Sequence, residues 1–109
     1  MADKSVVKSI QKYLQYIKNQ GIPVRFGVLY GSYVKESVHE WSDIDLLVVS
    51  PKYDKEQTND DIEQLWMFAA RTDSRIEPIP VGEHQYAEDD SSAIIEIARR
   101  EGEIISLAE

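Results

Sequence analysis

Two aspartates, Asp43 and Asp45, stand at the head of an apolar run that continues from Leu46 to Val49. Aspartate is a poor strand former, and like charges on one face of a strand repel each other, so this pair needs compensation. Because side chains alternate along a strand, both carboxylates point to the same face. Mg²⁺ is commonly held by one or two carboxylates together with substrate phosphates. We therefore interpret the pair as a metal site, against the simpler alternative of an exposed strand end.

A glycine and a serine, Gly31 and Ser32, stand where an apolar strand is expected to turn into a short helix. Glycine lets a ligand approach the backbone, a helix start offers free N–H groups, and serine adds a hydroxyl. Taken alone, the pair is a common turn. Beside a metal site it indicates a phosphate site, and the two sites together suggest a nucleoside triphosphate with Mg²⁺.

Helices and strands alternate along the chain around these residues. Apolar spacings of three and four predict helices, and short apolar runs predict strands. The expected elements are helix 5–19 ended by Gly21, strand 24–30, short helix 32–37, loop 38–42, strand 44–49, a helix capped by Thr58 or Asn59 that runs to about 71, an extended run 76–81, a helix capped by Ser91 or Ser92 and ended by Gly102, and a last strand or tail 103–107. The acidic stretch 88–90 is interpreted as a helix start. This alternation predicts an α/β (α+β) fold with helices on the sheet.

Two prolines, Pro78 and Pro80, interrupt the third extended run. Neither can donate a hydrogen bond to a ladder, so we expect this strand to be short or at an edge of the sheet. In the preceding helix, Trp66 and Phe68 are interpreted as core residues or as a surface that faces a partner.

Length and charge limit the classes of function. A chain of 109 residues suggests one domain, 1–109, and contains no cysteine. Its start has no apolar signal region, and no apolar run approaches a membrane span, so we expect a cytoplasmic protein. The net charge of −8, from 20 acidic and 12 basic residues, disfavours a broad nucleic-acid interface. It suits a basic protein partner, or cations drawn to clustered acids.

The chain resembles a known superfamily in these motifs. Gly31-Ser32, followed after ten residues by Asp43-Ile44-Asp45-Leu46, resembles the signature of the polymerase-β-type nucleotidyltransferases. The likeness is greatest to the stand-alone minimal nucleotidyltransferases of bacteria and archaea, and it implies their fold, a small mixed sheet flanked by helices. Many of these proteins are encoded with a HEPN-domain partner. In some pairs the partner is a ribonuclease toxin, and the nucleotidyltransferase is an antitoxin that can transfer AMP to it.

The resemblance also implies a third carboxylate on a neighbouring strand. Glu77, between Ile76 and Pro78, is the candidate, as general base or as a ligand of the ion that activates the acceptor hydroxyl. Two positions depart from the usual family pattern. Lys35 replaces an arginine and keeps its charge but not its bidentate fork, and Glu36 replaces a glycine near the phosphate site.

The activity implied is Mg²⁺-dependent transfer of a nucleoside monophosphate, AMP from ATP, to a hydroxyl acceptor. Asp43, Asp45 and Glu77 would hold two Mg²⁺ ions, and Gly31, Ser32 and Lys35 would contact the triphosphate. Because the chain has no room for an acceptor domain, a HEPN partner or a second copy in a homo-oligomer would complete the cleft. The alternative is an antitoxin or adaptor of the same fold that acts by binding its partner without catalysis.

Overall fold

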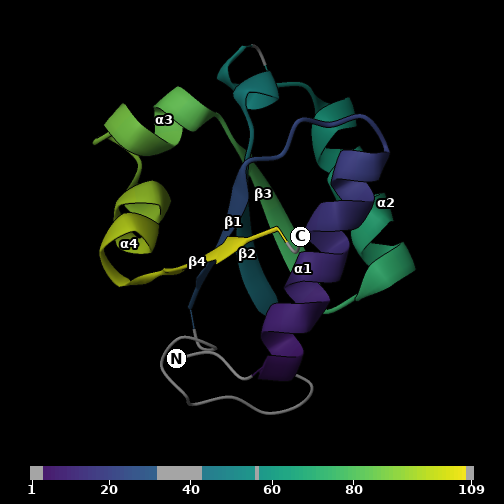
Figure 1. Cartoon of the computed structure of the whole chain (residues 1–109). Helices are drawn as coiled ribbons and strands as arrows, with labels where there is room; N and C mark the ends of the chain where they lie inside the picture. The colour runs from purple at the N-terminus through teal and green to yellow at the C-terminus, as the bar shows by residue number, and fades with distance from the viewer. Residues whose placement is uncertain (1–3, 32–42, 56, 108–109) are drawn as a thin grey trace.

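The computed structural model describes residues 4–31, 43–55 and 57–107 (Figure 1). The elements in chain order are α1 (Lys4–Asn19), β1 (Phe26–Tyr30), β2 (Ile44–Val49), the 3-10 helix η1 (Pro51–Asp54), α2 (Asn59–Thr72), β3 (Ile76–Val81), α3 (Glu83–Glu88), α4 (Ala93–Glu101) and β4 (Glu103–Ser106). The predicted helix 32–37 and loop 38–42 lie outside the described residues. Within the described ranges, no helix is both long and apolar enough to cross a membrane.

The four strands form one mixed sheet in the order β3-β2-β1-β4. β1 pairs antiparallel with both β2 and β4, whereas β2 and β3 are parallel and are connected through α2. The last residue of β1 and the first residues of β2 and β3 therefore lie at the same end of the sheet. The predicted mixed sheet flanked by helices is confirmed, and so is the edge position of β3.

The open edge of β3 has an unusual backbone. The carbonyls of Arg75 and Val81 accept hydrogen bonds from the N–H groups of Ile44 and Ser50. The backbone N–H and C=O groups of the odd-numbered residues of β3 therefore point toward β2. By alternation, the backbone groups of Ile76, Pro78 and Pro80 point to the open edge. The N–H of Ile76 donates within the preceding turn, and the prolines have none. The described edge therefore presents carbonyl acceptors without a free N–H.

Helices cover both faces of the sheet: α1 and α2 pack on one face, and α3 and α4 lie on the other (Figure 1). Two contacts join α1 to α2. The Tyr13 hydroxyl donates to the carbonyl of Leu65 at 2.9 Å, and the rings of Tyr16 and Phe68 meet edge to face. Phe68 is thus a core residue, whereas Trp66 stays 45% exposed on the outer side of α2.

Side-chain caps fix where α2 and α4 begin. The Thr58 side chain accepts the N–H of Asp61 in a capping box, and Ser92 caps α4, as two of the predicted alternatives have it. The helix α3 was not predicted, and the helix start expected at 88–90 is wrong. α3 ends at Glu88. Its first turn is capped by a residue far away in the sequence, because the Asp54 carboxylate accepts the backbone N–H groups of His84 and Gln85.

Candidate active site

Three side chains from adjacent strands meet at one end of the sheet. Asp45 of β2 is the register partner of Glu77 on β3 and of Tyr30 on β1. Leu47 and Val49, which share a face with Asp45, belong to the core beneath α4. The three polar side chains therefore lie on the α3/α4 face, beyond that core, and all three are half-buried. Asp43 precedes β2 and is exposed.

The carboxylates destabilise one another's charged forms. Burial, and then the charge of Asp43, raise the pKa of Asp45, although its hydrogen bond with Glu77 acts in the opposite sense. Burial raises the pKa of Glu77 as well, and the charges of Asp43 and Asp45 add to the rise. Both groups have pKa values above the ordinary carboxyl range, so a cation at this position would be favoured at neutral pH.

Tyr30 extends this cluster, although it was not among the site residues predicted from the sequence. Burial, followed by the charges of Asp45 and Glu77, raises the pKa of Tyr30 to about 12. Its phenol therefore remains a neutral hydroxyl beside two acids. The alternation of side chains along a strand could have identified Tyr30. It directly precedes Gly31, and it shares a sheet face with Asp45 once β1 and β2 are paired.

Gly31 lies directly against Asp45. Its φ is +85°, a conformation that favours glycine. A Cβ at this position would lie 2.5 Å from Oδ2 of Asp45 and 3.4 Å from its Cγ. Only a residue without a side chain leaves both this backbone conformation and the carboxylate undisturbed. Ser32, Lys35 and Glu36, which follow in the motif, lie outside the described residues, and their predicted roles remain predictions.

The donor set fits a hard divalent cation. All the groups are oxygens, the carboxyl pKa values are raised, and glycine leaves space where a Cβ would press on Asp45. Among the described residues, no three acidic, histidine or cysteine side chains are grouped closely enough to hold a metal by themselves. The predicted set of Asp43, Asp45 and Glu77 would therefore need substrate phosphates and water to complete the shell of an ion such as Mg²⁺.

Comparison with known proteins decides the family. Residues 7–104 match the model of the nucleotidyltransferase domain. The chain belongs to this family. The resemblance drawn from the Gly-Ser and Asp-x-Asp motifs is therefore confirmed, and the carboxylate cluster stands in a nucleotidyltransferase domain. Among proteins of curated function, no sequence matches significantly.

Three solved structures with the same fold are of toxin–antitoxin complexes. A crystal structure of a toxin–antitoxin with AMP-PNP is 17% identical, with a TM-score of 0.61, over 91% of this chain and 74% of that chain. A mutant of the toxin–antitoxin MntA–HpeT gives 16% identity and a TM-score of 0.58 over 90% of this chain and 72% of the other. A complex of a tri-AMPylated Shewanella oneidensis HEPN toxin with the MNT antitoxin gives 16% identity and a TM-score of 0.57, covering 92% and 71%. At these identities the likeness establishes the nucleotidyltransferase fold.

Proposed function

We propose that this chain is a Mg²⁺-dependent nucleotidyltransferase that moves AMP from ATP to a hydroxyl group on a HEPN-domain partner protein in the cytoplasm. The observation that carries the proposal is the register pairing of Asp45 with Glu77 beneath Gly31. It puts two carboxylates of raised pKa side by side, next to a glycine backbone that Asp45 approaches closely.

Asp43, Asp45 and Glu77 would hold the metal. When bound, Mg²⁺ would neutralise triphosphate charge and lower the pKa of the attacking hydroxyl. The acceptor oxygen attacks the α-phosphorus in line, the new P–O bond forms as the bond to the β-phosphate oxygen breaks, and pyrophosphate leaves. Glu77 either takes up the hydroxyl proton, for which its raised pKa suits it, or serves as a ligand of the ion that activates the hydroxyl.

The triphosphate would be held by the motif that follows β1. The backbone at Gly31 would approach the phosphates, Ser32 would donate its hydroxyl, and Lys35 would add a positive charge. These contacts would stabilise the charge of the triphosphate because the protein groups are already in place around it. A small scaffold can supply such contacts without an acceptor domain.

The choice of AMP and of a protein acceptor is supported by similar proteins. One similar structure contains AMP-PNP, and another contains a HEPN toxin that carries AMP groups. The substitutions Lys35 and Glu36 favour the second candidate, an antitoxin or adaptor of this fold that binds its partner without modifying it, because they weaken the phosphate site.

A binding experiment tests the site. Mg²⁺ with ATP should raise the melting temperature of the wild type, and the Asp43→Asn/Asp45→Asn variant should lose this response. The matched control is Asp60→Asn/Glu63→Gln, which removes the same charge from α2 and should keep it. If the Asp43/Asp45 variant retains the full shift, the proposed metal site is wrong.

A transfer experiment separates enzyme from adaptor. With the cognate HEPN-domain protein, ATP and Mg²⁺, mass spectrometry should find an added adenylate on the partner. Glu77→Gln should abolish transfer while leaving ATP binding largely intact, and Ser32→Ala should weaken ATP binding by about 1 kcal/mol or somewhat more. A partner that binds tightly, stays unmodified, and is neutralised equally well by Glu77→Gln would favour the adaptor.

A further inference from the structure

The outer side of α2 carries a cluster of large apolar residues that the nucleotide site does not use. Ile62, Trp66 and Met67 are 40%, 45% and 46% exposed. Single exposed apolar residues are ordinary, but here Ile62 and Trp66 are one helical turn apart and Met67 directly follows Trp66. Tryptophan and methionine are enriched in protein interfaces, and tryptophan is prominent among the residues that dominate binding energy. We call Ile62, Trp66 and Met67 the α2 patch.

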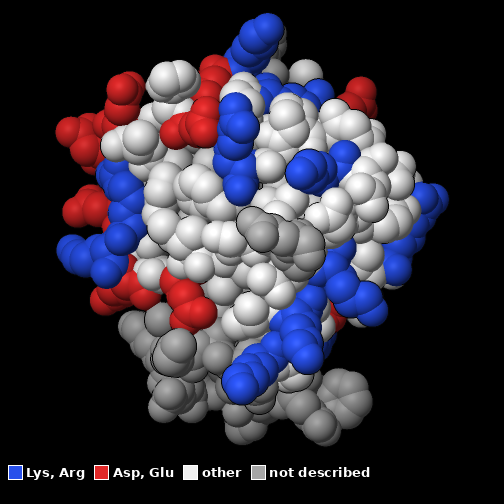
Figure 2. Space-filling model, viewed as in Figure 1, with Lys and Arg blue, Asp and Glu red and all other residues white. Residues whose placement is uncertain are grey.

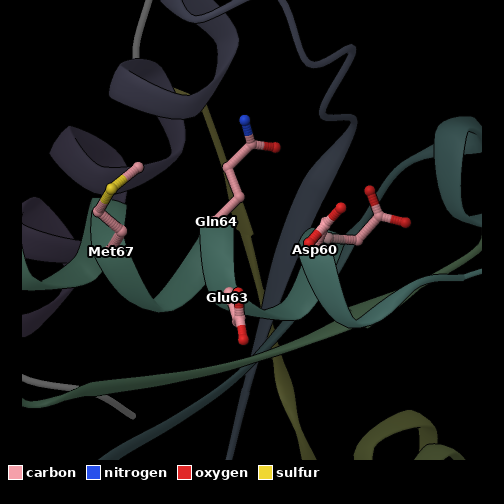
Figure 3. A pocket seen from close by; sticks show the side chains of 5 residues that line it. Asp60, Glu63, Gln64 and Met67 are labelled. Atoms are coloured by element: carbon pink, nitrogen blue, oxygen red, sulfur yellow. The ribbon is translucent and has the colours of Figure 1, made fainter.

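Acidic residues flank the α2 patch toward the start of the helix. Figure 3 shows Asp60, Glu63, Gln64 and Met67 around a surface depression, which Asp61 also lines. Asp61 is neutralised by Lys52, whose Nζ lies 3.6 Å from its carboxylate. Within the part of the chain that the structure describes, Asp60 and Glu63 take part in no ion pair. The depression thus combines two uncompensated carboxylates with the apolar side chain of Met67.

The position of the α2 patch separates it from the candidate active site. α2 follows the end of β2 and covers the α1/α2 face of the sheet, whereas Asp45 and Glu77 stand at the start of their strands on the other face. Uncompensated carboxylates also repel a triphosphate. The α2 patch is therefore suited to a protein surface that is apolar in its centre and basic at its rim.

The described helices of a second copy of this chain do not supply such a surface in a closed assembly. The outward side of α1 presents lysines and glutamines such as Lys8, Gln11, Lys12 and Gln15, without apolar residues (Figure 2 shows basic side chains on this side). α4 does present exposed isoleucines next to Arg100, but it lies on the opposite side of the sheet from α2 (Figure 1). A contact between α2 and the α4 of another copy would join unlike surfaces and would continue head to tail.

We infer that the α2 patch is a docking surface for a different protein, which presents an amphipathic helix with an apolar stripe flanked by Lys or Arg. The three exposed apolar residues would bury against that stripe, and Asp60 and Glu63 would pair with the flanking cations. The overall charge of −8 would speed the encounter with such a basic partner. This inference does not depend on nucleotide transfer.

Trp66 itself provides the reporter for a test. The chain has two tryptophans, so Trp41→Phe leaves Trp66 as the only one. The probe is a synthetic helical peptide about 18 residues long, with leucine at positions i, i+3, i+4 and i+7 and lysine elsewhere. We expect Trp66 emission to shift to shorter wavelength as this peptide binds. The same peptide with glutamate in place of lysine should give no shift.

Matched variants locate the binding by fluorescence anisotropy of the labelled peptide. Trp66→Ala should weaken binding about tenfold or more, and Glu63→Lys should weaken it severalfold with a smaller salt dependence. The controls on α4 are Ile94→Ala, whose parent side chain is as exposed as Trp66 at 45%, and Glu101→Lys, and both should bind within about twofold of the wild type.

Two results would overturn the inference. Equal loss of peptide binding in the α2 and α4 variants would mean that the peptide binds a generally acidic surface. Self-association of the wild type in sedimentation, abolished by Trp66→Ala, would mean that a second copy occupies the α2 patch. Circular dichroism of each variant establishes that it is folded.

Discussion

Comparing Gly31→Ala with Gly21→Ala separates the cost of backbone strain from the cost of the contact with Asp45. Both glycines have a positive φ, but only Gly31 lies against Asp45. Gly21 has φ +95° and Gly31 has φ +85°. A Cβ at Gly21 meets no atom within 4 Å, whereas a Cβ at Gly31 lies 2.5 Å from Oδ2 of Asp45. The two substitutions therefore share the strain, and only one creates the clash.

The expected magnitudes follow from these two effects. A positive φ costs a residue with a Cβ about 1–2 kcal/mol, and alanine recovers about 0.4–1 kcal/mol by restricting the unfolded chain. Gly21→Ala should thus lower the free energy of unfolding by about 1 kcal/mol. Gly31→Ala should cost about 1 kcal/mol more, because the Asp45 side chain must leave its rotamer.

The assay is urea unfolding followed by circular dichroism, for each glycine variant in the wild type and in an Asp45→Ala background. Without the Asp45 carboxylate, Gly31→Ala should cost no more than Gly21→Ala. Equal costs in the wild-type background, or an excess at Gly31 that survives Asp45→Ala, would refute the close approach of Gly31 to Asp45. Gly31→Ala should also lose the thermal shift with Mg²⁺ and ATP, which Gly21→Ala should keep.

Three further predictions concern charge, buried hydroxyls and a helix cap. Because the pKa values of Asp45 and Glu77 are raised in the fold, their ionisation costs stability. Asp45→Asn/Glu77→Gln should therefore be more stable than the wild type at neutral pH with EDTA, and this advantage should vanish as the pH falls through the raised pKa values in urea titrations. Tyr13→Phe should lose about 1 kcal/mol with its hydrogen bond to α2, whereas Tyr53→Phe should lose nothing, because the Tyr53 hydroxyl is buried without a partner among the described residues; similar losses in denaturant unfolding would contradict this. Thr58→Ala should cost about 1 kcal/mol by removing the cap of α2, and an unchanged urea midpoint would argue against the capping box.

The sequence predicted those helices and strands that are specified by residues within or next to the element itself. The apolar periodicity of α1, the Thr58 and Ser92 caps and the apolar run of β2 all lie within or next to the element that they define. The helix α3 was missed because Asp54, which accepts the N–H groups of its first turn, lies 30 residues earlier in the sequence than His84. A cap of this kind cannot be recognised before the chain is folded.

The candidate site was predicted as a set of residue types, and the structure adds their arrangement. The motif spacing selected Asp45, and the family resemblance implied Glu77, but their register pairing depends on the parallel alignment of β2 and β3, which is non-local. Tyr30 became part of the cluster for the same reason, through the pairing of β1 with β2. The contact between Gly31 and Asp45 was likewise beyond local reasoning.

The prolines of β3 also determine how another polypeptide can reach the carboxylates. An added strand needs N–H donors as well as carbonyl acceptors along the edge that it joins, and the described edge of β3 offers acceptors alone. Edge-to-edge aggregation of sheets is blocked on this side. In the proposed transfer, an acceptor protein would therefore not extend the sheet beside Glu77 and would bring its hydroxyl to the site on a helix or a loop.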